Sequence, residues 1–364
     1  MVIFFVLICI VGIVLLPYWL IRSNPFPQPS GKWQVGTSNI NWNSANHAGI
    51  IAKVWYPTNA ATGTKSQYID NIGRTLAVMT AHLSPIYNLV FNKFYLGRII
   101  TPAFLNATPA QHQDGFPVIL LSPGFGGMNF INTFYGLEFA SHGFIVVGIN
   151  HPGSSAGALL TDGTHVTFNP IEPEVFADID RFELVAAPLM VEQASNMSMV
   201  LDKIIGLNST IDSFLYQKIN TGKIFAAGHS LGGAASFIAC GKDRRIAKGV
   251  DFDGVFIDAI DTNYADKELL LIHADRDKYR PKSKTAQRQY DVITNRDETR
   301  IAELSGKANL QKLVFDANHL NFSDISIIIQ PAVAKVIGLV GKADGLDILL
   351  QTSRVTIDFF NKQT

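Results

Sequence analysis

The feature of this 364-residue sequence that most constrains its fold is a series of six short apolar segments separated by stretches of helical character. In chain order they are PVILL, FIVVGI, KIFAAG, GVDFD, LLLIHA and KLVFD, all between residues 117 and 316. Apolar strands that alternate with helices predict an α/β fold, with a mostly parallel sheet and helices on both faces. Such sheets bind ligands at the carboxyl ends of their strands, so functional residues are expected directly after these segments.

A serine held between glycines follows the third segment, in the stretch GHSLGG at residues 228–233. The order of strand, G-x-S-x-G and a helix rich in small residues is that of a nucleophile elbow. Its sharp strand-to-helix turn leaves no room for Cβ atoms beside the serine, which explains the glycines. We therefore expect an α/β-hydrolase fold with Ser230 as nucleophile, the alternative being an ordinary glycine-rich bend after a buried strand.

A serine nucleophile needs a general base, and the chain offers two histidines after Ser230. The triad of this fold runs in the order serine, acid, histidine, so only His273 and His319 qualify. His273 lies within the fifth apolar segment, which is typical of a core histidine. His319 follows the last segment in the polar stretch FDANHLNFSD, and we predict that it is the base.

The carboxylate that orients this base has two candidates. Asp253 ends the stretch GVDFDG, and Asp277 lies in HADRD after the next segment. Sequence spacing alone permits both.

The oxyanion hole of such an enzyme combines two backbone N–H groups. One belongs to the residue after the nucleophile, here Leu231, and the other to a loop that follows an earlier strand. The stretch VILLSPGFGG supplies this loop, and Phe125 between two glycines is its expected donor.

Charge balance and missing motifs exclude other classes of protein. Thirty Lys and Arg residues balance thirty Asp and Glu residues without a basic block, which argues against nucleic-acid binding. Neither a C-x-x-C nor an H-E-x-x-H spacing occurs, so we expect no metal and no cofactor. Cys9 and Cys240 lie in unrelated surroundings, and we expect no disulfide between them.

The N-terminus carries twenty uncharged residues, 2–21, with Tyr18 and Trp19 near the end of the run and Arg22 after it. This length spans a bilayer, and aromatic residues are typical of the membrane interface. A cleaved signal peptide would have a basic start and a small-residue cleavage site, which the segment lacks. We predict an uncleaved transmembrane anchor and a membrane-anchored protein, the alternatives being a signal peptide of a secreted or periplasmic protein and a buried core helix.

The rest of the chain is expected to form one catalytic domain. Residues 1–22 are the anchor or signal segment, 23–31 a linker and 32–364 the α/β-hydrolase domain. The stretch GIIAKVWYP predicts an early strand, and residues 190–206 predict a helix. Two further segments, 76–100 and 155–188, predict a core-facing helix pair or lipid cover and a candidate flap, respectively.

Several blocks, in their order along the chain, resemble those of a known family. The blocks are VGTSNINW, VWYP, TPAFLN, SPGFGGMNFINTFYGLEFASHGFIVVGINH, GHSLGGA, GVDFDG and NHLNFSD, followed by a stretch from Ala332 to Lys362 that resembles the family's closing helix. From about residue 32 onward the chain is similar to the secreted-type platelet-activating factor acetylhydrolases, also called lipoprotein-associated phospholipases, and to their bacterial relatives.

This resemblance implies roles for individual residues. The acid of the family matches Asp253 rather than Asp277. The base lies in an H-x-N-F-x-D block, matched here by His319, Asn321, Phe322 and Asp324, and the oxyanion amides match Phe125 and Leu231. The sequence departs from the family at Pro123, where mammalian members often carry histidine, and at Gly254, which replaces an apolar residue.

The resemblance also implies an activity. Members are calcium-independent esterases that remove short or oxidised acyl groups from the sn-2 position of phospholipids. An interfacial substrate agrees with an anchor at residues 2–21. The alternatives are a generic carboxylesterase, lipase or polyester hydrolase, and a catalytically inactive hydrolase fold that serves as a binding module.

Overall fold

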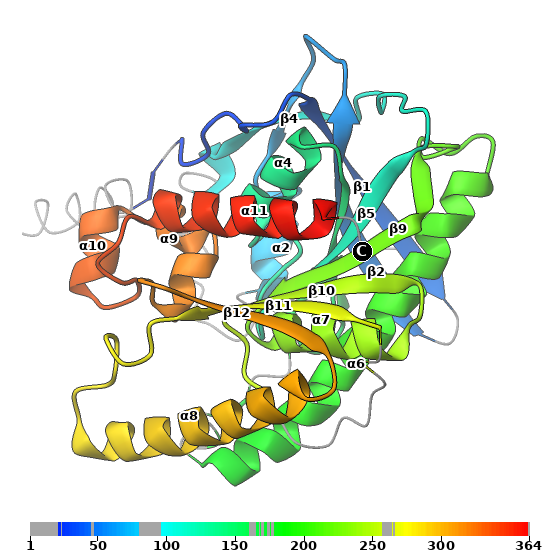
Figure 1. Ribbon diagram of the computed structural model, residues 1–364. Coiled ribbons are helices and arrows are strands. Elements are labelled where there is room, and N and C mark those ends of the chain that lie inside the picture. Colours follow the sequence, from blue (N-terminus) through cyan, green and yellow to red (C-terminus); the bar gives the residue numbers. More distant parts are fainter. Residues whose placement is uncertain are drawn as a thin grey trace, which may run out of the picture.

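Figure 1 shows a computed structural model of the chain. It describes residues 21–22, 24–44, 47–79, 96–159, 178–256 and 266–362, with residues 165–166, 168, 171–172, 175 and 264. Within these ranges, no helix has the length and apolar character needed to cross a membrane. The predicted anchor at residues 2–21 lies outside the described residues except for Ile21.

Six parallel strands form the larger part of a ten-stranded sheet. They are β5 (Phe116–Ser122), β6 (Ile145–Asn150), β9 (Ile219–His229), β10 (Ile246–Phe252), β11 (Glu268–Ala274) and β12 (Asn309–Phe315). Each coincides with one of the six apolar segments, so the predicted parallel sheet is confirmed.

The other four strands of the sheet come from the N-terminal part of the chain. Its strands are β1 (Gln34–Ser44), β2 (His47–Thr58), β3 (Lys65–Gln67) and β4 (Ile100–Leu105), and β2 is the predicted early strand. β2 runs antiparallel to both β6 and β1, and the full order is β12-β11-β10-β9-β5-β6-β2-β1-β4-β3. A separate ribbon pairs β7 (Ala158–Leu159) with β8 (His165–Val166).

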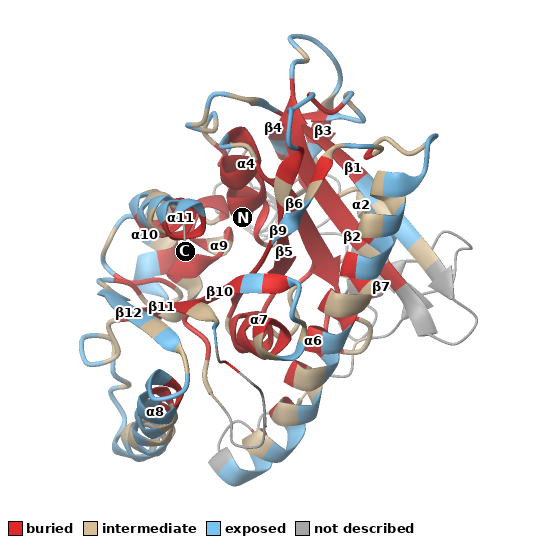
Figure 2. Cartoon of the chain, turned by 45° about the vertical axis from the view of Figure 1, so that its right-hand side comes forward, coloured by how far each residue is buried: buried red, intermediate tan, exposed pale blue. Residues whose placement is uncertain are grey.

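Helices cover both faces of this sheet (Figure 1). One face carries α4 (Thr133–Ser141) and α11 (Gly345–Asn361), and the other carries α6 (Ile179–Ser209), α7 (Leu231–Lys242) and α8 (Lys284–Ser305). The central strands are buried on both sides (Figure 2). Successive residues point to opposite faces, so Val118 of β5 joins the core under α6 and α7 whereas Ile119 joins the core under α4 and α11. Burial on both faces explains the nearly continuous apolar runs.

Two segments differ from their sequence-based expectations. The helix predicted at 190–206 begins already at Ile179, where the side chain of Asp178 accepts hydrogen bonds from two N–H groups of the first turn, so it includes part of the predicted flap at 155–188. The C-terminal stretch contains two helices instead of one, α10 (Pro331–Val336) and α11.

The remaining described helices are short: α2 (Ile72–Met79), η1 (Leu96–Arg98), η2 (His319–Phe322) and α9 (Ile325–Ile328). Most of the predicted helix pair at 76–100, residues 80–95, lies outside the described residues.

The strand order reverses at β5, which lies between β9 and β6. The chain passes from β5 to β6 on one side and returns to β9 on the other. A reversal of this kind opens a crevice at the carboxyl ends of the two strands. Phe125 follows β5 and Ser230 follows β9, so the topology brings both predicted site residues to this crevice.

Candidate active site

Ser230 occupies a strained turn between β9 and α7. Its backbone has φ 57° and ψ −125°, in the left-handed half of conformational space that side chains rarely adopt. The turn is held by a hydrogen bond of 2.9 Å from the N–H of Ser230 to the carbonyl of Phe252. A Cβ atom at Gly228 would lie 2.2 Å from the carbonyl oxygen of Gly232, and one at Gly232 would lie 2.4 Å from the carbonyl oxygen of Pro123. These close approaches are the reason for the glycines of the elbow.

His319 links the serine to a carboxylate. Its Nε2 lies 3.0 Å from Oγ of Ser230, and its Nδ1 lies 2.7 Å from Oδ2 of Asp253. The other oxygen of Asp253 accepts the N–H of Ala274 at 2.9 Å. Asp277, the alternative acid, is exposed in the turn after β11. Of the two carboxylates that the sequence left open, the structure places Asp253 beside the histidine.

The surroundings of Asp253 favour its ionised form. Burial by itself would raise the pKa of this carboxyl, but the hydrogen bond from His319 and the charges of His319 and Arg276 lower it to about 2. An ionised acid accepts the Nδ1–H of the histidine and so leaves Nε2 free to accept a proton. His273, the histidine assigned to the core from the sequence, is 1% exposed, and burial lowers its pKa to about 3.

The block that contains His319 is fixed by its own polar residues. Asn318 accepts the N–H of His319 at 2.8 Å through its side chain. The side-chain oxygen of buried Asn321 accepts the N–H groups of Asn318 and Gly341 at 2.8 and 2.7 Å. Asp324 accepts the first N–H groups of α4, at 2.8 and 3.1 Å. The motif therefore combines His319, the predicted base, with residues that fasten its loop to two other parts of the body.

His229, the variable residue of the elbow motif, was missed by the sequence analysis. Its Nε2 lies 3.0 Å from the backbone carbonyl of His319, and the two rings pack with centroids 4.6 Å apart. Burial lowers the pKa of His229 to about 3, so the ring is neutral and Nε2 is the donor. In the sequence, His229 is marked only by its position between Gly228 and Ser230, and this position alone does not indicate a role.

The two predicted oxyanion donors lie close to Ser230. Leu231 is the first residue of α7, so its N–H has no acceptor within the helix. Phe125 lies in the loop after β5, where a Cβ atom at Gly124 would be only 3.0 Å from Cβ of Ser230. Within the described ranges, neither N–H donates to a protein acceptor. Free N–H groups at a helix start and beside the nucleophile are suited to stabilise negative charge on a reacting carbonyl oxygen.

The loop that carries Phe125 rests on a buried polar network. The next residue, Gly126, has φ +72° and donates its N–H to the carbonyl of Ser154 at 2.8 Å. Beneath it, Oγ of Ser122 lies 2.9 Å from Nε2 of His151. Burial lowers the pKa of His151 to about 3, so this network carries a neutral imidazole.

A second buried cluster holds the loop that follows Asp253. Arg276 donates to the carbonyl of Gly254 at 3.2 Å and pairs with Asp297 of α8. Asp297, which is fully buried, also accepts the N–H of Phe256 at 2.7 Å. The carbonyl of Gly254 and the N–H of Phe256 are therefore hydrogen-bonded within the protein, and these bonds hold the loop that follows Asp253.

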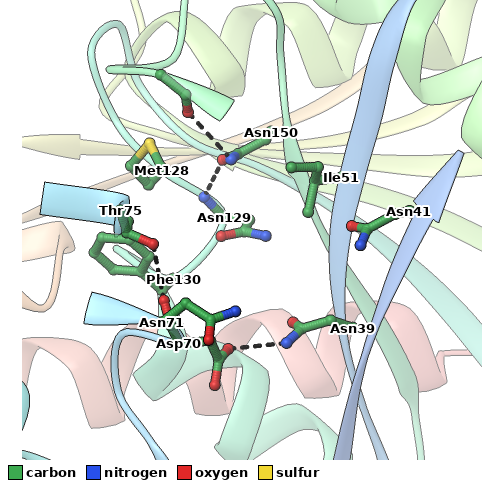
Figure 3. A pocket seen from close by; sticks show the side chains of 11 residues that line it. Asn39, Asn41, Ile51, Asp70, Asn71, Thr75, Met128, Asn129, Phe130 and Asn150 are labelled. Atoms are coloured by element: carbon green, nitrogen blue, oxygen red, sulfur yellow. Dashed lines mark hydrogen bonds between the residues drawn. The ribbon is translucent and has the colours of Figure 1, made fainter. Parts of the chain in front are cut away.

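A small recess of about 100 Å³ is lined by residues of β1 and β2, by Met128 to Phe130 and by Asn150 (Figure 3). Asn150 at the end of β6 accepts the N–H of Asn129 at 2.6 Å, and Asp70 pairs with buried Lys53 at 2.8 Å. The recess contains none of the five predicted site residues. No group of three or more histidine, cysteine or acidic side chains in the described part of the chain is arranged to hold a metal ion.

The fold and the elbow define an α/β-hydrolase-like protein. The family model described as platelet-activating factor acetylhydrolase, isoform II, matches residues 20–170 and 181–364, and the chain belongs to this family. Membership in this family makes the chain an ester hydrolase.

Two curated relatives agree with this assignment, and one solved structure shares the fold. The chain is 24% identical to the platelet-activating factor acetylhydrolase of Canis lupus familiaris, over 94% of this chain and 76% of the relative. It is 26% identical to a probable 1-alkyl-2-acetylglycerophosphocholine esterase of Arthroderma benhamiae, over 42% of this chain and 35% of the relative. A ferulic acid esterase from Streptomyces cinnamoneus shares the fold, with a TM-score of 0.64, 19% identity and coverage of 92% of this chain and 91% of its own.

Proposed function

We propose that the protein is a calcium-independent serine esterase that hydrolyses short or oxidised acyl groups at the sn-2 position of phospholipids. The observation that carries the mechanism is the continuous contact from Ser230 through His319 to Asp253, with distances of 3.0 and 2.7 Å. Membership in the acetylhydrolase family supports the substrate class. One relative of the chain, from Arthroderma benhamiae, is named a probable 1-alkyl-2-acetylglycerophosphocholine esterase, and this name specifies an acetyl group at the sn-2 position.

The first half of the reaction forms an acyl-enzyme. Oγ of Ser230 attacks the acyl carbonyl carbon while its proton passes to Nε2 of His319. The N–H groups of Phe125 and Leu231 then hold the negative carbonyl oxygen of the tetrahedral intermediate. As the ester bond breaks, His319 returns the proton to the departing oxygen, and a lysophospholipid leaves.

The second half releases the acyl group. A water molecule gives its proton to His319 and attacks the acyl-enzyme, again forming an oxyanion held by the two N–H groups. Collapse of this intermediate breaks the bond to Oγ, the proton returns to Ser230, and a carboxylic acid leaves. Asp253 stays ionised throughout and stabilises the imidazolium form of His319 in both halves.

The substrate distinguishes this proposal from its nearest alternative, a generic carboxylesterase or polyester hydrolase with the same triad. Turnover of phospholipids with sn-2 acetyl, oxidised and long acyl chains, compared with a simple aryl ester, separates the two. We expect turnover of the acetyl and oxidised substrates, with little for long acyl chains. Hydrolysis of the aryl ester alone would favour the generic esterase.

A catalytically inactive binding module is the third candidate. The left-handed backbone at Ser230 argues against it, because such strain is kept where the position of a side chain matters. A protein that binds phospholipids tightly but hydrolyses none of the esters tested would be such a binding module.

We also propose that residues 2–21 tether the body to a membrane. The structure supports this proposal at the end of the run, where the chain is already bonded to the body. Ile21 bridges to Ile329, and the N–H of Arg22 donates to the carbonyl of Ile328 at 2.8 Å. Fractionation of the full chain, compared with a chain lacking residues 2–20, tests this tether. A full chain that stays in the soluble fraction and is uncleaved would contradict it.

A further inference from the structure

Asp251 is a buried carboxyl that the triad does not use. It lies on β10 two residues before Asp253 and is fully buried. Its Oδ1 accepts the N–H of Gly254 at 2.7 Å, whereas Oδ2 has no hydrogen-bond partner in the part of the chain that the structure describes. A buried polar atom without a partner is costly and calls for an explanation.

The carboxyl of Asp251 lies between two glycines that belong to different parts of the site. A Cβ atom at Gly233, on the elbow helix α7, would lie 1.9 Å from Oδ1. A Cβ atom at Gly254, in the turn after Asp253, would lie 2.4 Å from Oδ2. Both glycines are thus required by the same side chain.

Backbone conformation does not explain Gly254. Its φ lies outside the left-handed region, so other residues could adopt this backbone. The three atoms nearest to its missing Cβ all belong to the carboxyl of Asp251. Gly254 is also a position where the sequence departs from the apolar residue of the resembled family, and the departure is explained by the space that Asp251 takes.

The hydrogen bond from Gly254 to Asp251 bears on the direction of the triad acid. Asp253 has φ 56°, a left-handed conformation that costs energy in a residue with a side chain. A side-chain oxygen that accepts an N–H three residues later closes a local turn and stabilises such a backbone. The Asp251 carboxyl therefore fixes the peptide between Asp253 and Gly254 from the inside.

The charges around Asp251 favour its neutral form. Burial raises the pKa of its carboxyl well above the usual value, and the negative charges of Asp297 on α8 and Asp253 in the following turn act in the same direction. The N–H of Gly254 and the positive charge of Arg276 oppose this shift. On the side of α7 the carboxyl of Asp251 faces Gly233, which has no charged side chain. A neutral carboxyl fits a site pressed against glycine Cα atoms.

We propose that Asp251 is a positioning residue that sets the spacing between the elbow helix and the acid turn, and thereby the alignment of Ser230, His319 and Asp253. It acts through Gly233 on one side and Gly254 on the other, and it does not touch substrate. The proposal rests on the triad given under the proposed function.

A double-mutant cycle of Asp251→Ala and Gly254→Ala tests this coupling through kcat, KM and melting temperature. Asp251→Ala should lower kcat about tenfold with little change in KM, because binding is intact and alignment is not. Gly254→Ala should lower kcat on the order of tenfold or more, since its Cβ meets the carboxyl. In the double variant the carboxyl is gone, so adding the Cβ should cost less than about threefold. Equal effects of Gly254→Ala in both backgrounds would overturn the proposal.

Asp251→Asn is the conservative variant, and it remains informative if Asp251→Ala does not fold. It keeps an acceptor for the Gly254 N–H and should keep kcat within about threefold of the native value. A folded-state pKa above the unfolded value gives stability that is present at low pH and lost as the pH rises. The melting temperature of Asp251→Asn, relative to that of the native protein, should therefore rise as the pH increases above about 4. A difference that does not change with pH, or a kcat as low as that of Asp251→Ala, would contradict a neutral positioning carboxyl.

Asp253→Asn, measured alongside, separates the two proposals. If it keeps full turnover, the triad is wrong, and the melting temperatures of the cycle still decide whether Asp251 and Gly254 are coupled. If it loses turnover while Asp251→Ala keeps kcat, the triad stands and the positioning role is rejected.

Discussion

Nε2 of His319 lies 3.0 Å from Oγ of Ser230, although 89 residues separate them in the chain. The elbow between β9 and α7 presents the serine, and η2 after β12 presents the histidine. A backbone group of each residue is bonded to another part of the molecule. The N–H of Ser230 bonds to Phe252, and the carbonyl of His319 accepts a bond from His229. The contact therefore depends on three strand ends at once.

The first prediction concerns the choice of acid. Asp253→Asn should lower kcat on the order of 10,000-fold, because the amide can no longer hold His319 in the reactive tautomer. The matched control is Asp277→Asn, which alters an exposed carboxylate and should keep kcat within about twofold. Steady-state hydrolysis of one ester by both variants measures this, and a larger loss in Asp277→Asn would reverse the assignment.

The second prediction concerns His229. His229→Phe keeps a ring to pack on His319 but removes the hydrogen bond to the His319 carbonyl, so kcat should fall about tenfold with KM nearly unchanged. His112→Phe, which changes an exposed histidine away from the triad, is the control and should have little effect. Native kcat in His229→Phe would show that the bond does not support the base.

The third prediction concerns the Phe125 loop. Gly124→Ala would place a Cβ atom 3.0 Å from Cβ of Ser230, so the loop or the serine must give by a few tenths of an ångström, which changes the position of the Phe125 N–H relative to Ser230. We expect kcat to fall about 100-fold, as for the loss of one oxyanion donor.

The control for this loop is Gly206→Ala in α6, where a Cβ atom meets nothing within 4 Å and activity should be unchanged. Pre-steady-state acylation, measured for both variants, shows whether the loss lies in the chemical step. A rise in KM with native acylation would contradict an oxyanion role.

The fourth prediction concerns acid stability. The pKa of Asp253 is about 2 in the folded protein, below its ordinary value, so its ionised form contributes stability above about pH 4 that is lost as the pH falls toward 2. A difference of this size corresponds to about 2 kcal/mol. The difference in unfolding free energy between the native protein and Asp253→Asn should therefore shrink between pH 4 and pH 2. Urea titrations at several pH values measure it, and a constant difference would show that Asp253 is not held ionised.

The fifth prediction concerns Asp324. Its carboxyl accepts the first two N–H groups of α4, so Asp324→Ala should lower the free energy of unfolding by about 2 kcal/mol. Asp358→Ala, which removes an exposed carboxylate from α11, is the control and should stay within about 0.5 kcal/mol. Chemical denaturation of both variants tests the structural part of the H-x-N-F-x-D block, and equal stability would leave that block without a fastening role.

The sequence predicted the part of the fold that has a strong periodic signal. Five of the six parallel strands are buried over most of their length, and the edge strand β12 is largely exposed, but all six have clear apolar runs. β1 and α8 were not predicted. The strand β1 is rich in asparagine, threonine and serine, and α8 is a mostly polar helix packed at the edge of the sheet. Weak apolar patterns of this kind do not distinguish such elements from loops.

The catalytic candidates could be placed from the sequence because each follows a strand. The choice between Asp253 and Asp277 could not be made from spacing, since both follow neighbouring strands. It depends on which carboxyl the turn directs toward His319, and the left-handed backbone at Asp253 decides this in three dimensions. His229 and Asp251 were missed for a related reason, because their roles come from contacts across the sheet.

Covalent labelling of Ser230 tests the proposed mechanism most directly. The protein is titrated with a fluorophosphonate while hydrolysis of an sn-2 acetyl phospholipid is followed, and the labelled peptide is identified by mass spectrometry. We predict one label per chain, on Ser230, with activity falling in proportion to labelling, and no label on Ser230→Ala. Full turnover by Ser230→Ala, or complete labelling of Ser230 with activity retained, would contradict the mechanism.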